Sequence, residues 1–239
     1  MMKLLLISNS TNPGEAYLGW PRQLITNFLK DTGVKRVLFI PYAGVSMSYD
    51  AYEAKVKAVF SELGYDLYSI HHEADPVKAV VEAEAVAVGG GNTFHLVREM
   101  QRNGVIHAIR GRALKGMPYM GWSAGSNVAC PTLCTTNDMP IVQPESFRCM
   151  NLIPFQINPH YLDAHPEGHG GETREQRIEE YLVANPEVYV AGLREATALI
   201  YEEGHLKLVG RHKMRVFHHG MEPREIEPGT DVDFLRLVK

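Results

Sequence analysis

The sequence contains little of what marks several common classes of protein. Cysteine is scarce, with three residues in 239. Their odd number and the lack of paired metal-ligand spacing predict free thiols in a reducing compartment. Positive charge is not in excess either, because 24 Lys and Arg stand against 28 Asp and Glu, for a formal net charge of -4. No basic stripe for phosphates is present, so nucleic acid is not an expected partner.

Long apolar runs are also absent. The N-terminal run Leu4–Ile7 ends at the polar stretch 8–10, which makes it too short for the apolar segment of a signal peptide. No stretch approaches the roughly 18 apolar residues of a membrane span, so no membrane contact is expected. Because no composition shift, repeat or linker divides the chain, we expect one domain over residues 1–239. We expect it in the cytoplasm, as a monomer or a homodimer that acts on a small soluble substrate.

Short apolar runs, by contrast, are frequent, and they alternate with segments of helical spacing. Helical spacing is clear at Tyr52, Val56, Val59, Phe60 and Leu63, which recur at three- or four-residue intervals with one adjacent pair. This alternation predicts an α/β fold with a three-layer, doubly wound, mostly parallel sheet, and it places functional residues at the carboxyl ends of the strands. The expected strands of the first half are 4–8, 36–41, 66–70, 85–88 and 117–120.

The second half of the chain is less regular. We expect an irregular stretch over 131–159 and then a helix over 172–183, which starts with the capping-box pair Thr173 and Gln176. Further strands, some of them antiparallel, are expected at 188–193, 198–201, 206–209 and 216–218.

The segment 121–125 reads Gly-Trp-Ser-Ala-Gly and directly follows an expected strand. A hydroxyl becomes a good nucleophile when its oxygen is exposed, close to a base, and opposite donors that stabilise the oxyanion. A G-x-S-x-G turn between a strand and a helix supplies this exposure, with Ser123 at its apex and the amide of Ala124 facing the oxyanion. The competing interpretation is a tight turn in which the serine only caps a helix.

A second glycine-rich segment, 89–92, follows the strand expected at 85–88. Glycine lets backbone amides approach a ligand without a side chain in between, so we assign the second oxyanion donor to Gly90 or Gly91. A phosphate loop is the rival, but neither G-x-G-x-x-G nor a Gly-Lys-Ser/Thr ending is present. A plain turn is the remaining alternative.

Eleven histidines are candidates for the general base. His160 stands out by position, because it follows the strand-like run 155–157 and an Asn-Pro pair that ends a strand. The spacing of His160, His165 and His169 invites a zinc site. The segment between them looks like an irregular loop rather than one ligand-bearing helix face, so no metal is expected.

The acid that orients the histidine has two candidates. Asp138 lies in the polar loop 135–140, and Glu195 follows the strand expected at 188–193. The residues alone leave both open. A carboxylate at the carboxyl end of a strand suits Glu195 as the partner of an imidazole, whereas a loop aspartate beside the site suits contact with a substrate ammonium.

Longer motifs that are typical of one family occur along most of the chain. They lie at 4–11, 40–45, 88–94, 121–127, 135–140, 157–160, 166–169 and 171–177. Together they resemble the peptidase E family of serine peptidases, also called dipeptidase E or α-aspartyl dipeptidase, and are far more specific than a G-x-S-x-G pattern alone. The resemblance implies a flavodoxin-like α/β fold similar to that of class I glutamine amidotransferases.

The resemblance also implies a set of site residues. The family's nucleophile falls on Ser123 and its histidine on His160, while both Asp138 and Glu195 match carboxylates proposed as the third member. We expect Glu195 to be the partner of the histidine and Asp138 to be a further essential site residue. The expected chemistry needs no metal or organic cofactor, because the protein supplies the nucleophile, the base and the oxyanion donors.

Substrate selectivity follows from the same resemblance. The family hydrolyses dipeptides with an N-terminal aspartate and leaves Glu-X, Asn-X and internal bonds intact. This selectivity requires a cation placed for the shorter carboxylate, and Arg174 is our candidate because its fork can bind a carboxylate bidentately. Further polar contacts to the substrate are expected from Asn127, Thr135 and Thr136.

Two departures from the family pattern limit the transfer of roles. Arg194 stands where a proline is expected, and a cation beside Glu195 can alter the orientation or charge of that acid. The stretch after about Ile200 matches poorly, so no role is transferred there. The alternative functions are a cyanophycinase-like or other small-substrate serine hydrolase on the same scaffold, and a binding module that uses segment 89–91 to hold a small anion.

Overall fold

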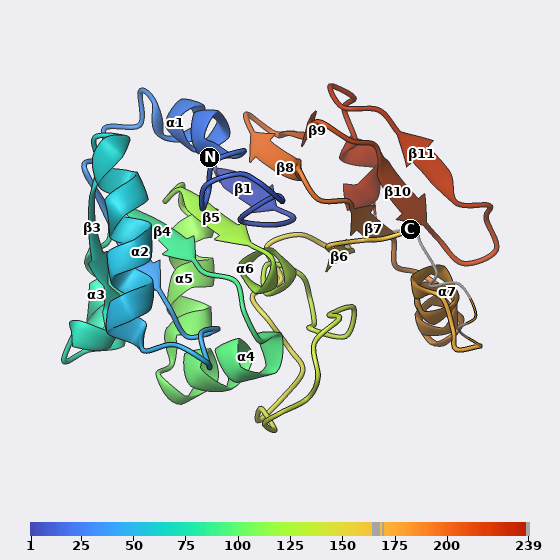
Figure 1. The fold of residues 1–239 in the computed structure, drawn as a ribbon, viewed down its shortest axis with the longest axis horizontal. Helices are drawn as coiled ribbons and strands as arrows, with labels where there is room; N and C mark the ends of the chain where they lie inside the picture. Colours follow the sequence, from blue (N-terminus) through green and yellow to red (C-terminus); the bar gives the residue numbers. More distant parts are fainter. Residues whose placement is uncertain (164–167, 169, 238–239) are drawn as a thin grey trace.

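A computed structural model of the chain describes residues 1–163, 168 and 170–237. Within these residues the strands form a seven-stranded sheet and a four-stranded sheet. In Figure 1 the helices that cover the large sheet occupy the left half of the view, and the small sheet lies on the right, next to α7 (Arg174–Ala184). No helix in this part of the chain is long and apolar enough to cross a membrane.

The large sheet confirms the expected α/β fold. From one edge to the other, its strands are β3 (Asp66–Ser69), β2 (Arg36–Ile40), β4 (Ala85–Val88), β5 (Tyr119–Trp122), β1 (Leu4–Ile7), β8 (Thr197–Glu202) and β9 (His205–Gly210). The first five strands are parallel, and β8 and β9 continue the sheet in antiparallel pairing. The sheet is therefore mostly parallel, with an antiparallel extension.

Two apolar cores lie on the two faces of this sheet because alternate residues of a strand point to opposite faces. Leu4 and Leu6 belong to one core, and Leu5 and Ile7 belong to the other. All four side chains are fully buried, as expected for a strand covered on both sides. The core of Leu5 includes residues of α1 (Arg22–Leu29) and α2 (Tyr49–Glu62), and that of Leu4 includes residues of α3 (Pro76–Glu82), α4 (Thr93–Arg102), α5 (Val105–Leu114) and the short α6 (Ala124–Asn127).

The small sheet was not predicted as a sheet of its own. Its strands, in order, are β11 (Arg224–Ile226), β10 (Met214–Phe217), β7 (Val190–Leu193) and β6 (Gln156–Pro159). β6 and β7 are parallel, while β7, β10 and β11 are antiparallel. Two short 3-10 helices complete the described elements, η1 (Ile70–His72) and η2 (Asp233–Arg236).

The capping box predicted for α7 is confirmed, although the helix begins at Arg174 and not at residue 172. The Thr173 side chain accepts a hydrogen bond from the amide of Gln176, and the Gln176 side chain accepts one from the amide of Thr173. This capping box satisfies two amides that have no partner inside the helix. It fixes the first turn of α7, which carries Arg174.

Candidate active site

Three central strands of the large sheet end at the same edge. Ile7 of β1 lies opposite Trp122 of β5, and Val88 of β4 lies opposite Gly121 of β5. The residues that follow these strands therefore meet at one place, where the sequence places the site.

The turn after β5 holds Ser123 in an unusual backbone conformation. Its φ is 54° and its ψ is -114°, which non-glycine residues rarely adopt. The glycines on either side make this turn possible, because a Cβ on Gly121 would collide with the carbonyl of Gly125, and a Cβ on Gly125 would collide with that of Val88. The G-x-S-x-G pattern thus forms a sharp strand-to-helix turn with Ser123 at its apex.

The loop after β4 packs directly against this turn. A Cβ on Gly90 would lie 3.0 Å from the Cβ of Ser123, and Gly91 has a φ of 139° with no room for a side chain beside Ala43. Among the described residues, the amides of Gly90, Gly91 and Ala124 form no hydrogen bond to a backbone carbonyl outside regular elements. Ala124 is the first residue of α6, where amides have no intrahelical acceptor. These amides are available as donors next to Ser123.

His160 and Glu195 come from the small sheet. Pro159 of β6 lies opposite Leu193 of β7, so the segments that follow the two parallel strands run side by side. Nε2 of His160 lies 3.0 Å from Oγ of Ser123, and Nδ1 of His160 lies 2.8 Å from Oε1 of Glu195. Both the histidine and the glutamate are partly exposed. The three side chains form one hydrogen-bonded series that spans the two sheets.

Ser8 and Asn9 connect the two sheets behind this series, and the sequence analysis assigns them no role. The buried Ser8 hydroxyl donates to the carbonyl of Leu193 and accepts from the amide of His160, at 2.7 and 2.9 Å. The Asn9 side chain accepts from the amide of Ala196, which follows Glu195. The available signal was a pair of polar residues immediately after a buried strand.

Asp138 lies apart from the histidine. Its Oδ2 accepts hydrogen bonds from the amide and the hydroxyl of Thr93, at 2.7 and 2.6 Å, and from the hydroxyl of Thr136 at 3.1 Å. Thr93 is the first residue of α4, so the carboxylate lies at the positive end of that helix. The structure therefore brings Glu195, and not Asp138, to His160.

Arg174 lies beside His160. Its guanidinium donates to the carbonyl oxygen of His160 at 3.0 Å and is half-buried. Burial, together with the nearby Arg177, lowers the pKa of Arg174. Among the described residues, no carboxylate forms an ion pair with it. The remaining donors of its fork are thus suited to an incoming anion.

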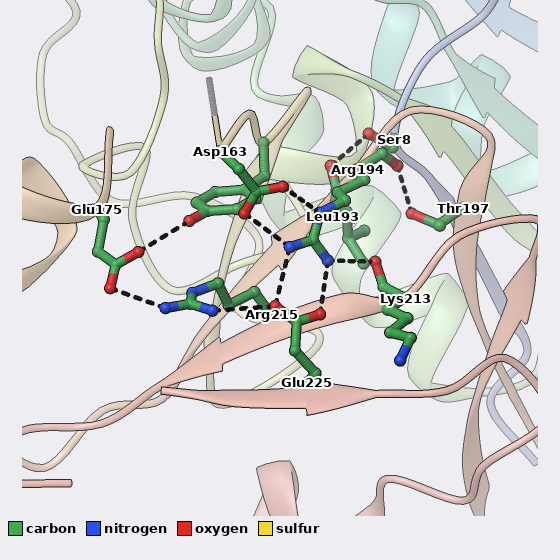
Figure 2. Close-up of polar contacts among 10 residues, drawn as sticks. Ser8, Asp163, Glu175, Leu193, Arg194, Thr197, Lys213, Arg215 and Glu225 are labelled. Atoms are coloured by element: carbon green, nitrogen blue, oxygen red, sulfur yellow. Dashed lines mark hydrogen bonds and ion pairs between the residues drawn. The ribbon is translucent and has the colours of Figure 1, made fainter. Parts of the chain in front are cut away.

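Arg194 forms its ion pairs with Asp163 and Glu225, and none is found with Glu195 among the described residues. Figure 2 shows its guanidinium between Asp163 and Glu225, with further contact to the carbonyl of Lys213. Hydrogen bonds from Arg194 lower the pKa of both Asp163 and Glu225. Glu225 also accepts a hydrogen bond from Arg215, which in turn donates to Glu175 (Figure 2). The hydroxyl of Tyr161 donates to the same Glu175 carboxylate.

Asn127 and Thr135 are not brought to an open surface. Both side chains are buried and donate to the carbonyl of Ile157 in β6, each at 2.8 Å. Thr136 is half-buried; its hydroxyl donates to Asp138 and lies 3.0 Å from the Thr93 hydroxyl. Buried polar groups need hydrogen-bond partners, and Asn127 and Thr135 find theirs on β6 and not on an open surface where substrate contacts were expected. The two side chains thereby hold the strand that leads to His160.

Groups that could hold a metal ion lie elsewhere in the described part of the chain. Two such groups occur, one formed by Asp50, Glu53, His71 and His72, and the other by His205, Asp231 and Asp233. Neither includes Ser123, His160 or Glu195. His165 and His169, the other members of the zinc pattern, lie outside the described residues.

An α/β fold with serine, histidine and glutamate in hydrogen-bonded series at the ends of its strands has the arrangement of a serine hydrolase. Residues 4–209 match peptidase family S51. The chain belongs to this family and is a serine peptidase.

Similar proteins agree with this assignment. The chain is 50% identical over 233 residues to a peptidase E of a Nostoc species, which covers 98% of this chain and 96% of the relative. It is 48% identical over 228 residues to a peptidase E of Escherichia coli, with coverage of 95% and 99%.

Solved structures show the same fold at lower sequence identity. A putative peptidase E from Listeria monocytogenes superposes with a TM-score of 0.69 at 23% identity, over 88% of this chain and 99% of that one. A peptidase from an acI-B1 actinobacterium gives 0.70 at 18% identity, over 97% and 96%.

Proposed function

We propose that this protein hydrolyses dipeptides with an N-terminal aspartate through an acyl-enzyme on Ser123. The observation that carries the proposal is the series of hydrogen bonds from Ser123 through His160 to Glu195, at 3.0 and 2.8 Å. A serine placed in this way has both a base to take its proton and an acid to hold the base.

In the proposed reaction, Nε2 of His160 takes the proton of Ser123 while Oγ attacks the aspartyl carbonyl carbon. Glu195 accepts a hydrogen bond from Nδ1, which keeps the proton-free nitrogen toward the serine and stabilises the imidazolium that forms. The imidazolium then gives its proton to the leaving amine as the C–N bond breaks. Water attacks the acyl-enzyme with the same histidine as base, which releases aspartate and restores Ser123.

The negative oxygen of each tetrahedral intermediate needs donors on the side away from the histidine. The amides of Gly91 and Ala124 are our candidates, because both lie next to Ser123 and neither forms a hydrogen bond to a backbone carbonyl outside regular elements among the described residues. One such donor contributes about 10²- to 10³-fold to kcat in known enzymes.

Arg174 is our candidate for the residue that selects aspartate. Its guanidinium is fixed to the carbonyl of His160 at one nitrogen, so its position relative to the nucleophile is set. An arginine at a fixed distance discriminates between the side chains of aspartate and glutamate, since the wrong length leaves a charge without its partner.

A cytoplasmic location remains a prediction, which Cys130, Cys134 and Cys149 support because all three are free thiols.

The first experiment measures hydrolysis of Asp-Leu, Glu-Leu, Asn-Leu and Leu-Leu by the wild type and by Ser123→Ala. Cleavage of Asp-Leu alone, lost in the variant, is the expected result. Ser61→Ala is the matched control, since Ser61 is an exposed serine of α2. Equal activity of Ser123→Ala and wild type would contradict the nucleophile, and cleavage restricted to β-aspartyl substrates would favour the cyanophycinase-like alternative.

A second experiment tests the role of Arg174. Arg174→Gln should raise KM for Asp-Leu and reduce the preference for Asp-Leu over Asn-Leu. Arg177→Gln is the matched control, because Arg177 lies on the same helix with 70% of its side chain exposed. Unchanged selectivity in Arg174→Gln would assign aspartate recognition to another residue.

A further inference from the structure

Tyr52 lies between the two loops that carry Ser123 and the glycines, although the sequence indicates only a helical apolar position. It belongs to α2 and is buried, with 5% of its surface exposed. Its hydroxyl lies 2.9 Å from the carbonyl oxygen of Gly90, to which it donates. The indole of Trp122, the residue before the nucleophile, donates to the same hydroxyl at 3.3 Å.

The hydrogen bond to Gly90 has a consequence for the next amide. The carbonyl of Gly90 and the N–H of Gly91 belong to one planar trans peptide, so the two groups point in opposite directions. A donor that holds the carbonyl on one side thereby holds the N–H on the other. Glycine on both sides of this peptide leaves its rotation nearly unrestricted by side chains, so an external contact is needed to fix it.

The loop is shaped around this phenol. A Cβ on Gly89 would lie 2.6 Å from the Tyr52 hydroxyl, whereas a Cβ on Gly90 would press on Ser123 and one on Gly91 on Ala43. Each of the three glycines therefore has a different close neighbour. Burial raises the pKa of Tyr52, so its hydroxyl keeps its proton and remains a donor at neutral and mildly alkaline pH.

We propose that Tyr52 is a positioning residue of the oxyanion site, whose hydroxyl holds the Gly90–Gly91 peptide with the Gly91 amide directed toward the reacting carbonyl. It acts through the peptide and does not touch the substrate. This inference rests on the proposed function, because it assigns a use to the Gly91 amide in that reaction.

Tyr52→Phe removes the hydroxyl and keeps the ring, so it tests the contact alone. The expected result is a fall of about 10- to 100-fold in kcat for Asp-Leu, with KM changed less than about twofold, because the lost interaction is made in the transition state. Tyr17→Phe is the matched control. The Tyr17 hydroxyl lies 3.5 Å from that of Tyr52 and, within the described part of the chain, forms no hydrogen bond with Gly90, so kcat should stay close to that of the wild type.

Inhibitor affinity separates positioning from a general loss of structure. An aspartyl aldehyde, which forms a tetrahedral oxyanion on Ser123, should bind Tyr52→Phe at least about tenfold more weakly, while free aspartate should bind within about twofold. If the wild type cleaves Asp-Leu but Tyr52→Phe loses affinity for both ligands equally, the inference is overturned. An unchanged kcat in Tyr52→Phe would overturn it as well. A wild type that neither cleaves Asp-Leu nor binds the aldehyde would overturn the proposed function and this inference with it.

Discussion

The two halves of the candidate site are held by different kinds of interaction. Ser123 and the glycine loop follow buried parallel strands, and close contacts at positions where only glycine fits fix their backbone. In the other half, hydrogen bonds to the side chains of Ser8 and Asn9 hold the backbone beside His160 and Glu195. Arg194, next to Glu195 in sequence, belongs to the network of ion pairs in Figure 2.

This difference indicates how each half responds to conditions. Packing against glycine does not depend on charge, so the nucleophile half should keep its geometry over a wide range of pH and salt. Ion pairs weaken with added salt and with protonation of their carboxylates, so the network around Arg194, beside Glu195, should loosen at low pH and at high salt. The comparison can be sharpened or broken by substitutions in each half.

The largest effect is expected in the histidine half. Glu195→Gln keeps the shape of the side chain but removes the charge that stabilises the imidazolium, and its amide can favour the wrong tautomer. We expect kcat to fall by about 10³- to 10⁴-fold, the order seen when an amide replaces the acid of a serine protease triad. Steady-state kinetics on Asp-Leu measure this loss, and a Tm within about 2 °C of the wild type would show that the fold is intact. A kcat within tenfold of the wild type would remove Glu195 from the mechanism.

The next effect is expected in the nucleophile half. Gly91→Ala introduces a Cβ that collides with the carbonyl of Ala43, at a φ that alanine rarely adopts. Displacement of the Gly91 amide should lower kcat by about 10²- to 10³-fold. Gly111→Ala is the control, because a Cβ there meets nothing within 4 Å and α5 should gain about 1 kcal/mol of stability. Full activity of Gly91→Ala would show that this loop is not held by packing.

A stability effect should distinguish Asp138 from Glu195. Asp138→Asn keeps the shape of the side chain but weakens the acceptor of the Thr93 amide at the start of α4. Loss of the charge beside a helix N-terminus should lower the free energy of unfolding by about 1–2 kcal/mol, as for other helix caps. Urea denaturation monitored by circular dichroism measures this change. An unchanged midpoint together with a lost kcat would instead give Asp138 a direct part in the reaction.

The smallest effect is expected at Arg194, and it should depend on pH. The folded-state pKa values of Asp163 and Glu225 are lowered, so their pairing with Arg194 stabilises the fold above the unfolded values, near pH 4, and is lost as pH falls further. Arg194→Met should therefore lower the Tm at pH 6 and in low salt, and should match the wild type more closely at pH 3 or in about 0.5 M salt. Thermal melts under these conditions test this, and a difference independent of both variables would contradict an ionic role.

The nucleophile half could be predicted from the sequence because its determinants are local. The elbow around Ser123 and the loop at Gly90 and Gly91 each lie within a few residues of a strand with a clear apolar run. Local signals also sufficed for the capping box of α7. They did not suffice for Tyr52, whose helical spacing indicates only a core position.

The histidine half required information that a local pattern does not hold. The pairing of β6 with β7, which places His160 beside Glu195, joins segments more than 30 residues apart. Local patterns therefore leave both Asp138 and Glu195 open as the acid, and the expectation of Glu195 rested on its position after a strand. The burial of Asn127 and Thr135 against the carbonyl of Ile157 was not foreseen either, because a polar side chain near a site looks the same in sequence whether it faces a substrate or a buried carbonyl.

The hydroxyl of Ser8 has a consequence for the order in which the protein can become active. It joins the end of the first strand to Leu193, 185 positions later, and to the amide of His160. As the chain leaves the ribosome, the parallel strands that present Ser123 can associate before the small sheet exists, because domains form from the N-terminus during synthesis. The base and its acid can join the nucleophile only after β7 and β8 have emerged. Catalytic competence is therefore gained only when β7 and β8 close onto the first strand.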